Sequence, residues 1–374
     1  MKYYIGKSEI LDVERCVNEV CSRFKNPKLI LYYSQSEHFK EYTMLLHKKF
    51  PDAVCMGVTT NVNISKTGST RKGLMAAGFE EGIFCCADVL EHVDKYPIKY
   101  VKRVQNCVKE IGKLNDTVCL AYTTAFCCGE ESVLSTLNSV LLEKKIPIFG
   151  CTAGDHYDSQ TTLVALNGNV YQNSCVFALF HYENGRIHFY RENIYKPISG
   201  HILTATKVDH VNRTVKEYNH TPAAKVYADE LGVRESEISS YFDSNPMGRI
   251  YGKDLFITAN NASTLNKGIT YHSRIYNNAK LVVLEADDYR EVIEETMKKV
   301  KREVPNPTFV IMCHCLARTM LFEQDGYMQD FAIRAGNVLG DYIGVSGYGE
   351  QMNRQHFNQT MTLAVFEEKK RGVQ

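Results

Sequence analysis

The stretch FGCTAGDH places ionisable side chains directly after a run of small residues. The run and its polar end comprise Gly150, Cys151, Thr152, Gly154, Asp155 and His156. Small residues let a ligand approach the backbone closely, and the Asp155 carboxylate can accept hydrogen bonds from an amino group. The same carboxylate can instead cap its own turn. His156 is one of the histidines that could ligate a haem iron.

A second group of polar side chains follows CHCLAR and continues in GYGEQMNRQHFNQT. Its members are Cys315, Arg318, Tyr348, Glu350, His356 and Asn358. A guanidinium offers a bidentate fork, so Arg318 can bind a ligand carboxylate or phosphate, or pair internally with Glu350. Asn358 both donates and accepts hydrogen bonds, and with His356 it can line a pocket or hold a hairpin together.

Metal and catalytic signatures are weaker than these binding features. Along a strand, Cys313 and Cys315 alternate with His314, so the three side chains cannot converge on one ion without a bend. No Cys-x-x-Cys occurs in the sequence, which removes the usual zinc and covalent-haem patterns. Cys315 and His356 could act as nucleophile and base, but GVSGYG has Tyr348 where Gly-x-Ser-x-Gly requires glycine. We therefore predict a protein that is not an enzyme.

Composition limits the function classes further. The 374 residues are 44% hydrophobic, and 44 Lys and Arg balance 43 Asp and Glu, so we expect no nucleic-acid partner. The N-terminus has no apolar secretory core and no segment approaches a membrane span, which predicts a cytoplasmic protein without membrane insertion. Thirteen cysteines, mostly inside apolar runs, suit reduced, buried thiols.

The elements that must position these residues occur as three similar segments. Each predicts an amphipathic helix, an apolar strand, a second helix, a second strand, a hairpin and a further strand. The first strands are KLILYYS, TVCLAYT and TFVIMCHC, and the second strands run into AVCMGVTTN, IPIFGCTAGD and DYIGVSGYGE. A strand-helix-strand passage implies parallel neighbours, and the hairpin adds an antiparallel strand. We predict an α/β fold of two closely packed domains with mixed sheets built from this repeated unit.

The polar stretches fall at the ends of the second strands. In open α/β sheets, ligands bind beyond the carboxyl ends of the strands, so the repeats predict a binding site there. For the first copy, GVTTNVN, we expect hairpin formation only, because it lacks the acidic residues of the other two. Residues 170–285 alternate short strand-like runs with one helix, TPAAKVYADELGV, which is the candidate domain junction and for which Thr221 is a possible N-cap.

Several of these stretches together resemble the FIST family. PIFGCTAGD, TTLVALNGNVYQNSCVFALF and TATKVDHVNRTVKEYNHTPAAKVYADELG are similar to its N-terminal domain, and CHCLARTM with GVSGYGEQMNRQHFNQTMTLAVFEE is similar to its C-terminal domain. The resemblance implies an N-terminal domain at residues 28–220 and a C-terminal domain at residues 221–367. Many relatives have glycine where this chain has Cys151.

The resemblance also implies a function. It implies a sensory, small-ligand-binding module of intracellular signal transduction, and amino-acid-like molecules are one proposed ligand class. Because no output domain is apparent, the expected partner is a separate signalling protein such as a kinase, a chemotaxis protein or a cyclic-dinucleotide component. The alternative is a haem-binding nitric oxide or redox sensor, with axial ligation by His156, His356 or a cysteine, and a cysteine-dependent enzyme stands third.

Overall fold

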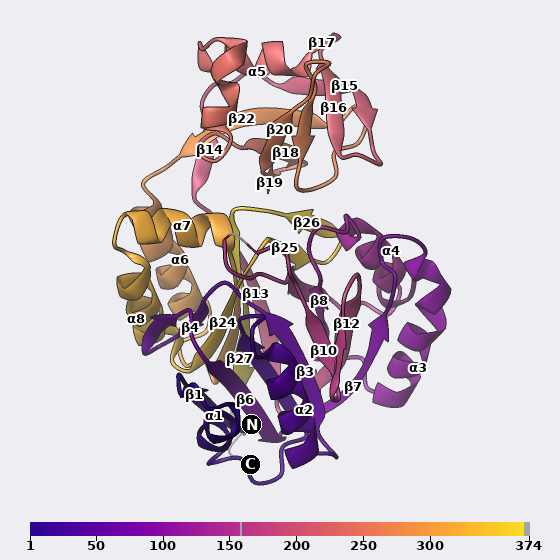
Figure 1. Ribbon diagram of the computed structural model, residues 1–374, viewed down its shortest axis with the longest axis vertical. Coiled ribbons are helices and arrows are strands. Elements are labelled where there is room, and N and C mark those ends of the chain that lie inside the picture. The colour runs from indigo at the N-terminus through magenta and orange to yellow at the C-terminus, as the bar shows by residue number, and fades with distance from the viewer. Residues whose placement is uncertain (158, 370–374) are drawn as a thin grey trace. The chain divides into compact units, whose positions relative to one another are not determined.

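The computed structural model describes residues 1–157 and 159–369, which form two compact units (Figure 1). Unit 1 comprises Met1–Arg191, Met297–Arg354 and Met361–Gln374, and unit 2 comprises Glu192–Thr296 and Gln355–Thr360. Both units combine helices and strands, so the predicted α/β class with two domains is confirmed. The predicted boundary at residues 220 and 221 separates two family domains and is a different division from that of the compact units. This boundary stays a prediction.

Unit 1 contains the three predicted repeats, each preceded by an edge strand. The first repeat runs through β1 (Lys2–Ser8), α1 (Val13–Val20), β2 (Leu29–Ser34), α2 (Phe39–Lys49), β3 (Val54–Thr59), the hairpin of β4 (Asn63–Ser65) and β5 (Gly68–Thr70), and β6 (Leu74–Glu81). The second runs through β7 (Ile83–Leu90), η1 (Pro97–Tyr100), α3 (Val101–Ile111), β8 (Thr117–Thr123), α4 (Glu130–Leu141), β9 (Ile148–Thr152), β10 (Val164–Leu166), β11 (Asn169–Tyr171) and β12 (Cys175–Tyr182).

The third repeat is interrupted by unit 2. It begins with β13 (Gly185–Asn193) and continues with α6 (Tyr289–Glu303), which belongs to unit 2 as far as Thr296. In unit 1 it then runs through β23 (Phe309–Cys315), α7 (Leu316–Gln324), α8 (Met328–Leu339), β24 (Tyr342–Gly347), β25 (Gly349–Met352) and β27 (Thr360–Glu368), and β26 (Gln355–Phe357), between the last two strands, belongs to unit 2. The predicted single helix after the first strand is a pair here, since α7 starts at the residue that follows β23.

Each repeat contributes one parallel strand pair, as predicted. The pairs are β2 with β3, β8 with β9 and β23 with β24, and each first strand also has an antiparallel neighbour: β6, β12 and β27. All three sheets are therefore mixed. Their central strands are buried on both faces, which explains why they read as continuous apolar runs.

The hairpins do not stay with their own repeats. β4 pairs with β24 of the third repeat, β10 pairs with β3 of the first, and β25 pairs with β9 of the second. Each sheet thus takes its last strands from another repeat, in a cyclic order. This exchange makes the three repeats depend on one another for completed sheets.

The inner faces of the three sheets share one hydrophobic core, and helices cover the outer faces. Equivalent positions of the first strands, Tyr33, Tyr122 and Cys313, all lie in this core, and the hydroxyl oxygens of the two tyrosines are 2.6 Å apart. Separate apolar clusters lie beneath α1 with α2 and beneath α3 with α4. Figure 1 shows these helix pairs on the outside of unit 1, with α7 and α8 over the third sheet.

Unit 2 is built around antiparallel strands. Its elements are β14 (Tyr195–Pro197), β15 (Leu203–Asp209), β16 (Thr214–Tyr218), β17 (Thr221–Pro222), α5 (Ala223–Leu231), η2 (Glu235–Tyr241), β18 (Met247–Tyr251), β19 (Asp254–Thr258), β20 (Asn260–Ser263), β21 (Ile269–Tyr271) and β22 (Lys280–Ala286). The predicted N-cap Thr221 is wrong, because Thr221 pairs with Tyr218 in a strand and Pro222 occupies the cap position.

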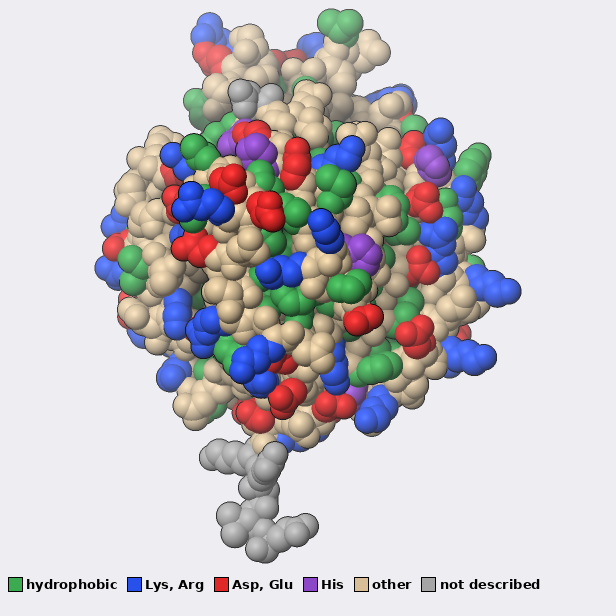
Figure 2. Space-filling model, turned by 60° about the horizontal axis from the view of Figure 1, so that its bottom comes forward, with side chains coloured by type: hydrophobic (Ala, Val, Ile, Leu, Met, Phe, Trp, Pro, Cys, Tyr) green, Lys and Arg blue, Asp and Glu red, His purple; other side chains and the backbone are tan. Residues whose placement is uncertain are grey.

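Figure 2 shows basic and acidic side chains intermixed on the face that it presents. All 13 cysteines are free of disulfide bonds, and most of them are buried. In the described part of the chain, none of the helices combines the length and the apolar character that a membrane crossing requires.

Candidate functional site

The three similar stretches meet in a cyclic set of backbone hydrogen bonds at the ends of β3, β9 and β24. We call residues 59–61, 152–155 and 346–348 the strand-end ring. The amides of Gly154, Asn61 and Tyr348 donate to the carbonyls of Thr59 (2.9 Å), Ser346 (2.9 Å) and Thr152 (3.2 Å), respectively. Each bond joins one repeat to another, so the recurring stretches form one structural feature rather than three independent turns.

The small residues of the ring are required by close backbone contacts. A β-carbon added to Gly154 would lie 2.2 Å from the Ser346 carbonyl oxygen, and one added to Gly347 would lie 2.0 Å from that of Thr152. Within β9, a β-carbon on Gly150 would lie 1.8 Å from the Ala121 carbonyl oxygen on the neighbouring strand. These distances are far below van der Waals contact, so backbone packing alone explains these glycines: between repeats for Gly154 and Gly347, and within the second repeat for Gly150.

Asp155 is completely buried and is held by donors from two repeats. Its carboxylate accepts hydrogen bonds from the Ser36 amide (3.2 Å), the Ser36 hydroxyl (2.6 Å) and the Ser159 hydroxyl (2.7 Å). The Asn61 side chain donates to the Asp155 carbonyl oxygen at 2.8 Å. Three donors on one buried carboxylate satisfy it well. Asp155 therefore fixes the ring to the loop after β2.

A polar network extends from the ring towards the surface. Arg71 donates from Nη2 to Asn61 Oδ1 (3.3 Å) and to Glu323 Oε2 (2.5 Å), and it also contacts the Tyr157 hydroxyl. Tyr157 donates to the same Glu323 oxygen at 2.7 Å. His156 lies apart from this network, with its Nε2 2.8 Å from Glu37 Oε1 on the half-exposed surface.

Arg318 and His314 form a buried polar pair at the end of β23. Arg318 is 1% exposed and donates from Nε to His314 Nε2 at 3.4 Å, and its guanidinium carbon lies 5.3 Å from the centre of the Phe322 ring. His314 Nδ1 lies 3.1 Å from the Thr319 hydroxyl, which in turn lies 2.8 Å from that of Ser346 in the ring. Because a neutral imidazole that accepts at Nε2 carries its proton on Nδ1, His314 donates to Thr319.

The charge state of His314 follows from its surroundings. Burial, and then the positive charge of Arg318, lower the pKa of His314 well below its ordinary value of 6.5. The imidazole is thus neutral at neutral pH and serves as an acceptor that orients the guanidinium. Its ring lies against Phe322 and Phe331, whereas Cys313 lies in the central core, as the predicted alternation of the strand requires.

The remaining predicted residues of unit 1 lie around the same strand ends. Cys315 is 3% exposed and caps α7. Glu350 is completely buried on β25, where it pairs in register with Cys151 of β9, and β25 also lies beside β23. Tyr348 packs its ring edge-on to Phe126 at 4.8 Å and donates its hydroxyl to the Ser159 carbonyl at 3.4 Å.

Two predicted site residues, His356 and Asn358, belong to unit 2. The side-chain Oδ1 of Asn358 accepts from the Ala259 backbone amide at 3.2 Å, and its backbone amide donates to the Ile257 carbonyl at 3.1 Å. The buried His356 accepts a hydrogen bond at its backbone carbonyl from Arg249 at 2.5 Å. Unit 1 thus contains ten of the twelve predicted residues, from Gly150 to His156 and from Cys315 to Glu350, and His156 lies apart from the others at the surface.

Sequence reasoning missed the partners that hold the site. The first copy of the motif does form a hairpin, but it also supplies Asn61 to the ring. Ser36 was not predicted as a site residue. It follows the end of β2 at the same edge as the other strand ends, and this position could have identified it. The sequence suggested His314 only as a metal ligand. Its contact with Arg318 arises because α7 begins directly after β23 and so places Arg318 beside it.

Comparison with protein families identifies both halves of the chain. The model described as the FIST N domain matches residues 28–221, and the model described as the FIST C domain matches residues 223–353. No curated protein matches the sequence.

Proposed function

The chain belongs to the FIST family, and on that basis we propose that it is an intracellular sensory protein that binds a small polar ligand and acts through a separate signalling partner. FIST domains are associated with the sensing of small ligands in signal transduction, and they are not an enzyme family. A kinase, a chemotaxis protein or a cyclic-dinucleotide component would carry the output. The cytoplasm is the compartment in which such a partner would be met.

The observation that carries the proposal is the buried polar group beside the strand-end ring. Arg318 and Glu350 are both almost completely buried, and burying charged groups is costly unless partners compensate for the lost water. The group lies at the carboxyl end of parallel strands, where α/β folds bind ligands. The Arg318 guanidinium, oriented by His314, suits the carboxylate of an amino-acid-like ligand.

Asp155 has a supporting role in this proposal. Its carboxylate accepts three hydrogen bonds within the protein, so a ligand amino group would have to displace Ser36 or Ser159. We assign it the task of holding the ring, which positions the strand ends. The ligand contacts in unit 1 are then expected from Arg318 and Glu350. For His356 and Asn358, which belong to unit 2, ligand contact stays a separate prediction.

The haem alternative has less support from the histidines of unit 1. His314 uses Nε2 and Nδ1 for Arg318 and Thr319, so iron ligation would break a buried network. His156 is paired with Glu37 at the surface, where a haem would stay exposed to solvent. A Soret band that survives desalting of the purified protein would favour haem over an organic ligand.

A thermal-shift screen of the full chain with amino acids, nucleotides and haem tests the proposed function. A ligand that binds the folded state raises the melting temperature, and the size of the shift follows its concentration. For the ligand found, we expect Arg318→Lys and Glu350→Gln to raise Kd at least tenfold in calorimetry. The matched control is Arg186→Gln, because Arg186 is exposed on unit 1.

Two outcomes would contradict the proposal. One is the absence of any melting-temperature shift across the three ligand classes. The other is a ligand whose Kd is unchanged in both Arg318→Lys and Glu350→Gln, since it would bind elsewhere. Where Arg318→Lys fails to fold, the Glu350→Gln result decides between these possibilities.

A further inference from the structure

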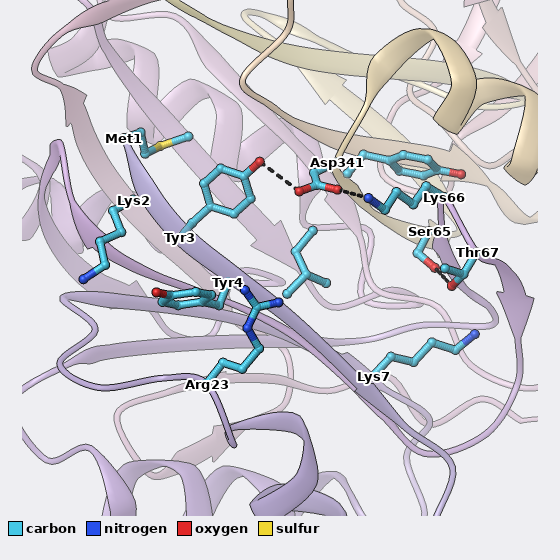
Figure 3. Close-up of a pocket in the computed structure, with 12 residues that line it drawn as sticks. Met1, Lys2, Tyr3, Tyr4, Lys7, Arg23, Ser65, Lys66, Thr67 and Asp341 are labelled. Carbon is cyan, nitrogen blue, oxygen red and sulfur yellow. Dashed lines mark hydrogen bonds and ion pairs between the residues drawn. The ribbon is translucent and has the colours of Figure 1, made fainter.

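Unit 1 contains a cavity at the opposite ends of the strands from the ring. A cavity of about 550 Å³ lies between edge strand β1, the turn that joins β4 to β5, and the start of β24 (Figure 3). Asp341 and Tyr342 contribute from the start of β24, whereas the strand-end ring includes the last residues of that strand. This volume falls in the range of small-molecule sites.

The cavity exists because one repeat departs from the other two. In the second and third hairpins, Leu166 and Met352 pair with Met56 and Phe149, and both pack against the central core. The equivalent position of the first hairpin is Ser65, which pairs with Ile343. A serine is too small to fill the space between the sheets that leucine or methionine fills elsewhere.

The next residue differs in the same way. Asn167 and Asn353 accept hydrogen bonds at Oδ1 from Cys55 and Ile148, and so fasten their hairpins to the neighbouring strands. The first hairpin has Lys66 there, whose ammonium lies 2.5 Å from Asp341 Oδ1. In the first hairpin, a charged lysine at the cavity thus replaces the asparagine whose side chain holds each of the other two hairpins to its neighbouring strand.

The charges around the cavity favour an anion. Four cationic side chains and one carboxylate line it: Lys2, Lys7, Arg23, Lys66 and Asp341. Lys2 pairs with the buried Glu80 at 2.7 Å, and Figure 3 shows its ammonium at the edge of the lining group. Lys66 is neutralised by Asp341.

Arg23 is the charge best placed to meet a ligand. Its guanidinium carbon lies 4.7 Å from the centre of the Tyr4 ring, and Figure 3 shows the group among the lining residues. No acidic side chain of residues 1–157 and 159–369 forms an ion pair with it. Lys7 has only a long contact to Glu9, at 3.9 Å. Tyr4 and Ile5 add aromatic and aliphatic surface beside these cations.

We propose that this cavity is a second ligand site, which binds a small organic anion with a phosphate or carboxylate head group on an aromatic or apolar body. Arg23 and Lys7 receive the head group, since a guanidinium binds either anion through paired donors. The side chains of Tyr4 and Ile5 contact the body. The site goes beyond the proposed sensory site at the strand-end ring, because its residues are different and lie at the other ends of the strands.

Calorimetric titration of the full chain with simple probes tests the site. Phenyl phosphate and benzoate each carry one of the two anionic head groups on an aromatic body. Inorganic phosphate has only the head group, and phenol has only the aromatic body. We expect saturable binding of at least one aromatic anion and at least tenfold weaker binding of phosphate alone and of phenol. Arg23→Gln should raise the Kd of the bound probe at least tenfold, and Arg186→Gln should leave it unchanged.

A second variant tests the shape of the site. Ser65→Leu restores the apolar residue of the second hairpin and should abolish probe binding by filling the cavity. Arg318→Lys should leave probe binding unchanged, so failure at this site is distinguishable from failure at the strand-end ring. Binding of neither aromatic anion, or a Kd unchanged by both Arg23→Gln and Ser65→Leu, would overturn the proposal.

Discussion

Arg318 Nε donates to His314 Nε2 across 3.4 Å inside the protein, so a neutral histidine acts as the acceptor for a buried guanidinium. The pair links the start of α7 to the end of strand β23, and through Thr319 it reaches Ser346 of the strand-end ring. Protonation of His314 would place two positive charges together and remove the acceptor. The orientation of Arg318 therefore depends on an uncharged His314.

This relationship predicts a loss of stability at acidic pH. The pKa of His314 is lowered in the folded protein, so below about pH 6.5 the unfolded chain binds a proton that the folded chain does not. Stability from this residue is complete above the unfolded pKa and falls as the pH drops, by about 1.4 kcal/mol per pH unit. Urea denaturation between pH 7.5 and 5 measures this slope.

The variant His314→Asn separates this residue from the other titrating groups. Wild type is expected to be more stable at pH 7.5, and its advantage over the variant should shrink steadily below about pH 6.5. A difference between the two proteins that stays constant across the whole pH range would mean that His314 is not buried in its neutral form.

Asp155→Asn should destabilise the fold rather than merely weaken ligand binding. With the amide nitrogen in the place of Oδ2, the Ser36 and Ser159 hydroxyls would both face a donor, so two of the three accepted hydrogen bonds would lack their acceptor. We expect the free energy of unfolding to fall by about 2 kcal/mol, as for other buried groups left unpaired. Chemical denaturation measures the change.

The control for this substitution is Asp94→Asn, since Asp94 is exposed. It should change the free energy of unfolding by no more than about 0.5 kcal/mol. Unaltered stability of Asp155→Asn together with lost ligand binding would show that Asp155 contacts the ligand, contrary to the supporting role assigned here.

The sequence predicted the elements of unit 1 better than their assembly. Apolar runs such as LILYYS encode buried strands locally, and an intervening helix favours a parallel pair, so β2 with β3 and its two counterparts were predictable. The sheet that a hairpin joins is decided by tertiary contacts. β4 and β10 have three residues each, and such short strands carry no pattern that distinguishes their own sheet from the next.

The same limit applies to the candidate site. Asp155 was identified as an ionisable group at a strand end, but its partner Ser36 lies 119 positions away, and no local pattern connects the two. Strand geometry predicted that Cys313 and His314 face opposite sides. The contact of His314 with Arg318 could not be predicted in this way, because it depends on α7 beginning at the residue that follows β23.

Gly150→Ala should be among the most damaging single substitutions. The new methyl group would lie 1.8 Å from the Ala121 carbonyl oxygen, so β8 and β9 would have to separate where they form a parallel pair. We expect a loss of about 3 kcal/mol or more, or a failure to fold, because backbone cannot move aside as a flexible side chain can. Thermal denaturation of the soluble fraction measures this loss.

Gly200→Ala is the matched control, since no atom lies within 4 Å of the position of its new methyl group. Its melting temperature should stay close to that of wild type. A Gly150→Ala protein with wild-type stability would mean that the close approach between β8 and β9 is not required, and the glycine would then point to a ligand instead.

Thiol reactivity distinguishes a binding protein from a cysteine-dependent enzyme. Cys128 is exposed, whereas Cys315 is 3% exposed, so a disulfide reagent such as Ellman's reagent should react first with Cys128. Burial raises the pKa of the adjacent Cys127 to about 11, which keeps its thiol protonated and slow near neutral pH. We expect one rapid equivalent of released thionitrobenzoate, and its loss in Cys128→Ser. A rapid equivalent that survives in Cys128→Ser but disappears in Cys315→Ser would place an activated thiolate beside Arg318, and the protein would then have to be tested for covalent chemistry.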